Sequence, residues 1–226
     1  MISIISPIYN EADNLMELYR RVVVALESIQ EEFEFILVEN GSSDRSLEII
    51  KKLREKDPRI KYVSLSRNFG HQGGIVAGLA NVSGNAVITL DGDLQHPPEL
   101  IPNLVELWKK GYDVVYTTKK VNKHIGSWRV FPTRVFYKLI SYISDVSLTY
   151  GQSDYRLLDR KVVDVLIQIP EKNKFLRGMV KWIGFSQIGV EYEVAQRKRG
   201  QSKFSLWNYI SFAHDGIFSF STVPLK

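Results

Sequence analysis

Apolar residues in the first half of the chain alternate between short continuous runs and stretches with helical spacing. Five short runs predict β-strands, at residues 2–6, 35–39, 61–66, 86–90 and 114–116. Helices are predicted behind a cap at Asp13, from Asp44 to just before Asp57, over residues 73–81, and from Pro97 onward. After residue 117 the alternation weakens, and apolar positions outline one more helix face over residues 128–143.

This order of elements predicts an α/β fold in which helices cover both faces of a mostly parallel sheet. Ligands of such open sheets bind outside the carboxyl ends of the strands. Four polar clusters follow predicted strands, at residues 7–11, 39–44, 67–72 and 91–95. The sequence therefore predicts one binding site built from four loops. It contains neither a G-x-G-x-x-G nor a G-x-x-x-x-G-K-[ST] loop, which argues against a dinucleotide-binding fold and a P-loop.

Composition narrows the class of protein. A length of 226 residues with 44% apolar residues fits one α/β domain, not two, and the lack of cysteine excludes disulfides and thiolate chemistry. Residues 1–113 carry 12 lysines and arginines against 17 aspartates and glutamates, a balance of −5, whereas residues 114–226 carry 18 against 8, a balance of +10. The acidic half suits a metal ion, and the basic, aromatic-rich half suits a polyanion or a membrane surface.

The Asp91-Gly92-Asp93 motif is the clearest candidate for chemistry. On an extended backbone Asp91 and Asp93 project to the same side, and Gln95 continues the alternation with a neutral oxygen. Paired carboxylates bind a hard divalent cation and leave positions for diphosphate oxygens, which is what a departing nucleoside diphosphate requires. The same residues are also typical of a turn at the end of a strand, and the motif alone does not decide between the two interpretations.

Seven stretches lie in order along nearly the whole chain: SPIYNEADNL, VENGSSD, SRNFGHQGGIVAGL, LDGDLQHPPEL, GQSDYRLLDR, FLRGMVKWIGF and RKRGQSKF. Together they resemble the family-2 inverting glycosyltransferases of the GT-A fold, most closely the polyprenyl-phosphate glycosyltransferases such as bactoprenol glucosyltransferases and dolichol-phosphate mannose synthases. The resemblance implies a GT-A catalytic domain at residues 1–203, with a nucleotide-sugar and metal half at 1–117 and an acceptor half at 118–203. Residues 204–226 would form an amphipathic, membrane-proximal tail of interface helices, ahead of any transmembrane helices.

The resemblance also implies which residues hold the donor. These are Pro7, Tyr9, Glu11, Glu39, Asn40, Gly41, His71, Asp91, Gly92 and Asp93, with Asp91, Asp93 and Gln95 as ligands of Mg²⁺ or Mn²⁺. For His71, a structural hydrogen bond to the backbone is an equally good interpretation. The family usually carries two aspartates where this chain has Glu39 and Asn40. Because an amide donates as well as accepts, recognition of the base is left open.

Asp154 matches the position of the family's catalytic aspartate. A sugar hydroxyl needs a base to remove its proton, whereas a phosphate acceptor is already charged, so Asp154 is expected either to act as that base or to orient the acceptor. From chemistry alone, an N-cap or a carboxylate paired with Arg156 or Arg160 is the alternative. The side chains expected to bind an acceptor phosphate are Arg129, Arg134, Arg177, Arg197, Ser202 and Lys203.

The sequence thus predicts inverting transfer of a sugar from a nucleotide sugar to a polyprenyl phosphate, at the cytoplasmic face of the cell membrane. A UDP-sugar is favoured over a GDP-sugar as donor, and assembly into a homo-oligomer is compatible with the sequence. The first alternative is the same fold acting on a polysaccharide or another hydroxyl acceptor. Two further alternatives are a non-catalytic nucleotide-sugar sensor and a basic nucleic-acid-binding protein, and the acidic first half argues against the latter.

Overall fold

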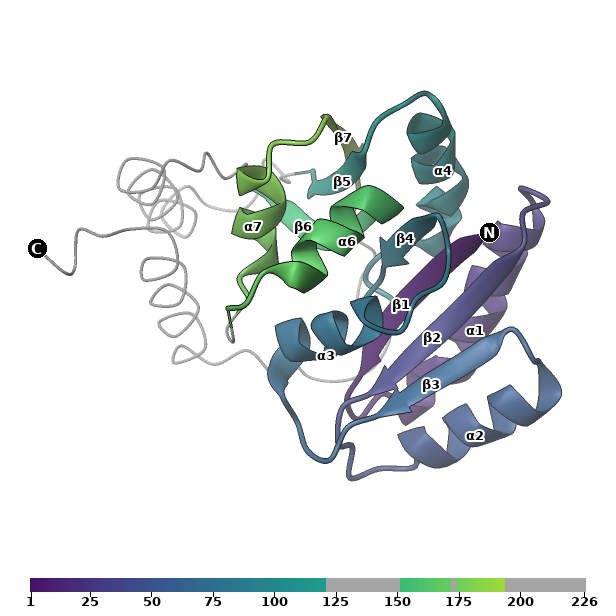
Figure 1. The fold of residues 1–226 in the computed structure, drawn as a ribbon. Helices are drawn as coiled ribbons and strands as arrows, with labels where there is room; N and C mark the ends of the chain where they lie inside the picture. Colours follow the sequence, from purple (N-terminus) through teal and green to yellow (C-terminus); the bar gives the residue numbers. More distant parts are fainter. Residues whose placement is uncertain (121–150, 172–173, 194–226) are drawn as a thin grey trace, which may run out of the picture.

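The computed structural model describes residues 1–120, 151–171 and 174–193, which form a seven-stranded sheet flanked by helices (Figure 1). The strands are β1 (Ile2–Ile8), β2 (Phe33–Glu39), β3 (Ile60–Ser64), β4 (Ala86–Thr89), β5 (Val114–Lys119), β6 (Gln152–Asp159) and β7 (Gln187–Tyr192). Their order across the sheet is β3-β2-β1-β4-β6-β5-β7. Among these strands β6 alone runs against its neighbours β4 and β5, and the other pairs are parallel. The predicted α/β fold with a mostly parallel sheet is confirmed.

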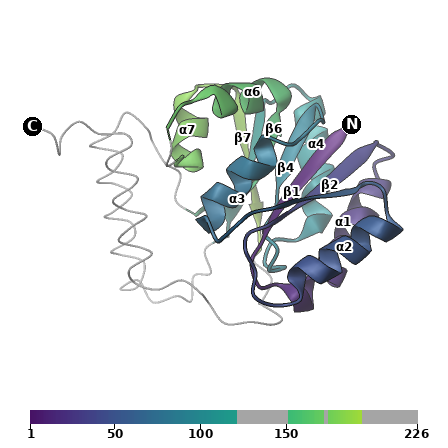
Figure 2. The same ribbon diagram turned by 60° about the horizontal axis from the view of Figure 1, so that its bottom comes forward.

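Two buried apolar layers hold the helices on opposite faces of the sheet (Figures 1 and 2). The helices are α1 (Ala12–Glu27), α2 (Ser46–Lys56), α3 (Gly70–Leu79), the 3₁₀ turn η1 (Pro98–Leu100), α4 (Ile101–Lys109), α6 (Arg160–Gln168) and α7 (Leu176–Trp182). Ile4 packs in the layer of α1, α2 and α4, whereas Ile5 packs in the layer of α3, α6 and α7. Neighbouring residues reach opposite layers because side chains alternate along a strand. Both predicted helical layers are therefore present.

Three helices start at residues other than those predicted. α1 starts at Ala12 instead of behind a cap at Asp13, and α2 starts at Ser46 instead of Asp44. The carboxylate of Asp44 accepts hydrogen bonds from the backbone N–H groups of both Ala12 and Ser46, so it joins the two loops instead of lying in a helix. α3 starts at Gly70, three residues earlier than predicted. Its first turn therefore contains His71.

The described part of the second half contains two strands and two helices that the apolar pattern did not reveal. β6 is buried along nearly its whole length although Gln152, Asp154 and Arg156 lie in it. Burial of these polar side chains removes the alternation by which a strand is usually recognised. The helix predicted over residues 128–143 and the tail at residues 204–226 lie outside the described residues. None of the described helices is both long enough and apolar enough to span a bilayer.

The close packing of α3 on β1 generates a stability prediction. A Cβ added at Gly78 would overlap with the Cγ2 atom of Ile5. We expect Gly78→Ala to lower the free energy of unfolding by about 1–3 kcal/mol, measured by urea denaturation, because the helix must move off the strand. In an unhindered helix the same change stabilises by about 1 kcal/mol, so an unchanged or higher stability would contradict the packing.

Candidate active site

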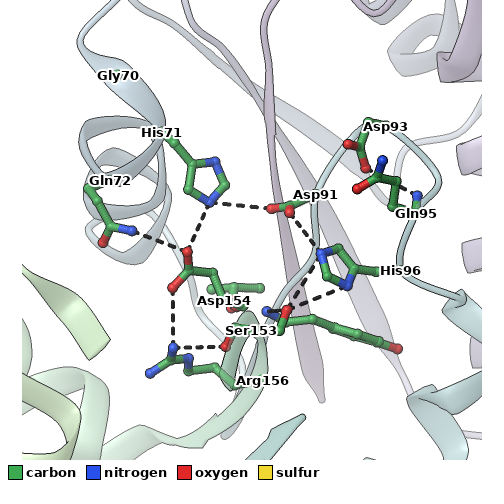
Figure 3. Close-up of polar contacts among 12 residues, drawn as sticks. Gly70, His71, Gln72, Asp91, Asp93, Gln95, His96, Ser153, Asp154 and Arg156 are labelled. Atoms are coloured by element: carbon green, nitrogen blue, oxygen red, sulfur yellow. Dashed lines mark hydrogen bonds and ion pairs between the residues drawn. The ribbon is translucent and has the colours of Figure 1, made fainter. Parts of the chain in front are cut away.

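The start of β6 meets the end of β4 at the carboxyl edge of the parallel strands. β6 is antiparallel to β4 and pairs Arg156 with Thr89, so the same register carried two residues further sets Asp154 opposite Asp91. From α3, the imidazole of His71 lies between these two carboxylates (Figure 3). The structure thus brings together three residues that the sequence placed in separate motifs.

Asp154 is a buried carboxylate with several donors around it. Arg177 of α7 binds it with two bonds, from Nε to Oδ1 at 2.9 Å and from Nη2 to Oδ2 at 2.7 Å. Arg156 donates to Oδ1 at 3.2 Å, and Gln72 donates to Oδ2 at 3.3 Å. The hydroxyl of Thr89 donates to the main-chain carbonyl of Asp154 and fixes β6 at this point. Both carboxylate oxygens are therefore already engaged.

The cations around Asp154 keep it ionised. Burial favours the neutral acid, but Arg177, His71 and Arg156 outweigh burial and hold the pKa of Asp154 well below its usual value. Burial lowers the pKa of Arg156 to about 10, which leaves this guanidinium charged at neutral pH. A carboxylate stabilised in this way has little tendency to accept a proton.

Asp91 is held from both sides by histidines (Figure 3). His96 Nε2 lies 2.9 Å from Oδ2, and His71 Nε2 lies 3.3 Å from Oδ1. Behind the buried ring of His96, the hydroxyl of Tyr192 lies 2.6 Å from Nδ1. Desolvation opposes the charge of Asp91, but the two histidines outweigh it and lower the pKa of Asp91. Asp91 is therefore an anionic oxygen donor in a fixed orientation.

Asp93 and Gln95 lie beside each other on the loop that follows Asp91 (Figure 3). The Oδ1 atom of Asp93 accepts a hydrogen bond from the backbone N–H of Gln95 at 3.1 Å. Leu94 between them has a φ of 61°, a strained conformation for a branched side chain that persists where the surroundings enforce it. Gly92 brings the loop against β1, since a Cβ there would lie 2.7 Å from Ile8 Cδ1. The loop is thus shaped by close contact with the sheet.

The chemistry of this loop fits a hard divalent ion that also binds a substrate. Asp91 and Asp93 supply carboxylate oxygens and Gln95 supplies an amide oxygen, which are the ligand types that Mg²⁺ and Mn²⁺ accept. In the described part of the chain, no group of three or more histidine, aspartate or glutamate side chains could hold a metal ion on its own. Mg²⁺ is commonly held by one or two carboxylates together with substrate phosphates and water. A metal here would therefore share its ligands with a bound diphosphate.

Glu39 and Asn40, which depart from the usual pair of aspartates, are both buried and hold loops in place. The Glu39 carboxylate accepts from the Ser42 N–H and the Ser64 hydroxyl. The carboxamide of Asn40 donates to the Gly70 carbonyl and accepts from the backbone N–H of residue 69, each at 2.9 Å. An aspartate could not make the first of these bonds, because a carboxylate only accepts. Asn40 therefore fixes the loop that leads to His71, and its contact with a base stays a prediction.

The remaining predicted donor residues lie along the same edge of the sheet. Pro7 lies in β1 against α3, where a Cβ added at Gly74 would be 3.0 Å from its Cβ atom, and Tyr9 follows in the next loop. Glu11 precedes α1 and accepts from the Asn14 side chain at 2.6 Å. Gly41 has a φ of 70° and lies against the backbone of residue 67. Contacts of Pro7, Tyr9, Glu11 and Gly41 with a donor stay predictions.

The sequence predicted only some of the residues that meet at this site. Among the predicted acceptor residues the structure places Arg177 at the site, and the others lie outside the described residues: Arg129, Arg134, Arg197, Ser202 and Lys203. The pairing of Asp154 with Arg156, considered as an alternative from the sequence, is present. Sequence reasoning did not assign Gln72, His96 or Tyr192 to the site. A polar side chain among apolar residues of a strand, such as Tyr192 in GVEY, is a signal that could have been followed.

Comparisons with known proteins agree with this architecture. The profile described as Glycosyl transferase family 2 matches residues 3–167. An uncharacterized glycosyltransferase, YkcC of Bacillus subtilis, is 42% identical over 224 residues, which cover 99% of this chain and 69% of that protein. A bactoprenol glucosyl transferase of Shigella phage SfV is 37% identical over 225 residues, which cover 100% of this chain and 73% of that protein. The chain is therefore similar over its full length to longer glycosyltransferases.

Solved structures show the same fold at lower identity. Glucosyl-3-phosphoglycerate synthase from Mycobacterium tuberculosis, in complex with Mn²⁺, uridine diphosphate and phosphoglyceric acid, aligns with a TM-score of 0.62 at 18% identity, covering 96% of this chain and 76% of that one. A mannosyltransferase from Pyrobaculum calidifontis with GDP-Man and Mn²⁺ aligns with a TM-score of 0.60 at 16% identity, covering 96% and 69%. The fold is therefore that of GT-A glycosyltransferases.

The position of His71 between two carboxylates generates a pH prediction. Desolvation opposes its charge, but Asp91 and Asp154 outweigh desolvation and raise the pKa of His71 from 6.5 to about 9. We expect NMR titration of the metal-free protein to show this value, and Asp91→Asn to lower it. The charged form favours folding, so this contribution to stability is complete below pH 6.5 and is lost as the pH rises through about 9. Titration of His71 near pH 6.5 in the metal-free protein would contradict the geometry.

Proposed function

The chain belongs to glycosyl transferase family 2 and is a glycosyltransferase that uses a nucleotide sugar, and we propose that its acceptor is a polyprenyl phosphate. The proposal includes a divalent metal ion at Asp91 and Asp93, a UDP-sugar as donor, and action at the cytoplasmic face of the membrane. Full-length similarity to bactoprenol glucosyl transferases supports the lipid acceptor. A structural neighbour bound to Mn²⁺ and uridine diphosphate supports the metal and the nucleotide.

The environment of Asp154 is the observation that carries the choice of acceptor. A general base must be free to accept a proton, and it works best with a pKa near the operating pH. Asp154 is instead bound through both oxygens by Arg177, with Arg156 and Gln72 beside it, and its pKa is held low. An acceptor that is already anionic needs no base, whereas a sugar hydroxyl does. The site therefore favours a phosphate acceptor over a hydroxyl acceptor.

The protein's contribution to transfer is positioning and charge. Asp91 and Asp93, with Gln95 beside them, would hold the metal ion, which when bound neutralises charge on the departing diphosphate. Asp154 anchors Arg177 in a fixed orientation, and we place the acceptor phosphate beside this guanidinium because arginine binds phosphate oxygens at fixed angles. A single in-line displacement then requires the acceptor oxygen and the departing diphosphate to lie on opposite faces of the anomeric carbon, so that one bond to this carbon forms as the other breaks. Placing the two substrates in this way lowers the barrier by reducing the entropy cost of bringing them together.

A panel of nucleotide sugars tests the function. The chain would be incubated with vesicles containing a polyprenyl phosphate, Mn²⁺ and each UDP- or GDP-sugar in turn, and the lipid product would be identified by mass. We expect a glycosyl phospholipid from a UDP-sugar and no product from Asp93→Asn, which keeps the size of the side chain but removes an anionic metal ligand. Product formed only on a polyprenyl alcohol or a sugar alcohol would instead assign a hydroxyl acceptor.

Steady-state kinetics of Arg177→Ala test the acceptor position. Loss of a charge-assisted hydrogen bond costs about 1.5–3 kcal/mol, so we expect kcat/KM for the lipid phosphate to fall about 10- to 150-fold while KM for the donor is unchanged. Lys181→Ala is the matched control, because it removes a cation from the same helix α7. Equal effects of the two substitutions, or a raised KM for the donor, would place the acceptor elsewhere.

A further inference from the structure

A chain of three hydrogen-bonding groups runs from the edge of the sheet into the site. Tyr192 is the last residue of β7, the edge strand opposite β3. Its hydroxyl lies 2.6 Å from Nδ1 of His96, and Nε2 of the same ring lies 2.9 Å from Oδ2 of Asp91. Tyr192 and His96 are each 3% exposed. The edge strand is thus connected to a proposed metal ligand by two consecutive hydrogen bonds.

The order of donors and acceptors in this chain follows from the chemistry of its ends. Burial raises the pKa of Tyr192, so its phenol keeps its proton and can donate. An ionised Asp91 carboxylate can only accept. Nε2 of His96 therefore donates to Asp91, and the Tyr192 hydroxyl hydrogen-bonds Nδ1 of the same ring. The two contacts therefore hold the ring of His96 at both nitrogens.

The ring of His96 is also held in place by packing. Its centroid lies 5.5 Å from that of Tyr192 and 5.6 Å from that of Tyr155, and the two tyrosine rings meet edge to face. The hydroxyl of Tyr155 donates to the carbonyl of Pro97 at 3.1 Å and does not take part in the chain. Packing thus restricts the position of the imidazole. The Ser153 hydroxyl lies 3.4 Å from Nδ1 and 3.5 Å from Nε2 and does not distinguish the two nitrogens, whereas the Tyr192 hydroxyl contacts Nδ1 and Asp91 contacts Nε2.

We propose that Tyr192 is a positioning residue that, by holding the ring of His96 at Nδ1, fixes the orientation of the Asp91 carboxylate for metal and diphosphate. This inference rests on the proposed function, because Asp91 is a metal ligand only there. Groups that hydrogen-bond to metal ligands and orient them typically contribute 10- to 100-fold to metal affinity or activity. Tyr192 therefore acts on the metal end of the site from a strand that carries none of the predicted metal ligands.

The first test reads the ring nitrogens of His96 directly in the metal-free protein. Two-bond ¹H–¹⁵N correlation of histidine-labelled protein distinguishes Nδ1–H, Nε2–H and doubly protonated rings, and His96→Gln identifies the signal among the four histidines. We expect a protonated Nε2 for His96 in the wild type, and in Tyr192→Phe a shifted His96 Nδ1 resonance, because this substitution removes only the hydroxyl that contacts Nδ1. Tyr155→Phe is the matched control, since it removes a hydroxyl from the same ring cluster without affecting the imidazole.

The second test measures Mn²⁺ binding in the presence of UDP by electron paramagnetic resonance. We expect Tyr192→Phe to weaken Mn²⁺ by about 10-fold or more and Tyr155→Phe to leave it unchanged. In the His96→Gln background, Tyr192→Phe should cause no further loss of Mn²⁺ affinity, because the hydrogen-bonded chain from Tyr192 to Asp91 is already interrupted.

Two outcomes would overturn the positioning role of Tyr192: an unchanged His96 Nδ1 resonance in Tyr192→Phe, or equal losses of Mn²⁺ affinity in Tyr192→Phe and Tyr155→Phe. Failure of the wild type to bind Mn²⁺ with UDP would instead defeat the metal site itself. Transfer to a hydroxyl acceptor would defeat the proposed acceptor without affecting either readout.

Discussion

The site depends on holding two carboxylates, Asp91 and Asp154, at the point where β4 and β6 meet. Two like charges placed together away from water raise each other's pKa, so both stay ionised only if cations compensate them. The surrounding elements supply those cations: α3 brings His71, α7 brings Arg177, and β6 itself brings Arg156. The antiparallel direction of β6 is essential, because it places the start of the strand, and with it Asp154, at the end of β4. A parallel strand would place its carboxyl end there, and Asp154 would lie away from Asp91.

The compensating cations differ in kind between the two carboxylates. Asp154 is paired with arginines, whose charge persists at any physiological pH. Asp91 is paired with histidines, which can exist as neutral rings. Removing the charge opposite Asp154 would leave a buried anion unpaired, which is costly. His71 lies against both carboxylates, so its charge acts on both. Asp154 therefore has permanent cations beside it, whereas the charge opposite Asp91 depends on histidines.

The sequence was sufficient for the first half of the fold and insufficient for the second. Apolar strands and amphipathic helices up to residue 119 follow periodicity, so their order and the loops after them were predictable from local pattern. Strand β6 was not predictable in this way. Its buried residues Asp154 and Arg156 are charged, and their burial is made possible by the hydrogen bond between them. The approach of Asp91 to Asp154 was not predictable either, since it follows from the antiparallel register of β4 and β6, in which Thr89 bonds to Asp154 across 65 residues of sequence. Predicting the contact of Tyr192 with the site likewise requires knowing that β7 lies at the edge of the sheet, next to β5.

The replacement of an aspartate by Asn40 has a structural consequence for the same site. The carboxamide of Asn40 donates to the Gly70 carbonyl and accepts from the backbone N–H of Phe69. One side chain therefore holds the loop at the start of α3. A carboxylate in its place would face that carbonyl as a second acceptor, which leaves a buried group without a donor and costs about 1–3 kcal/mol. The loop determines where His71 stands between Asp91 and Asp154. The identity of residue 40 is therefore coupled, through the position of His71, to the charge balance of the carboxylate pair.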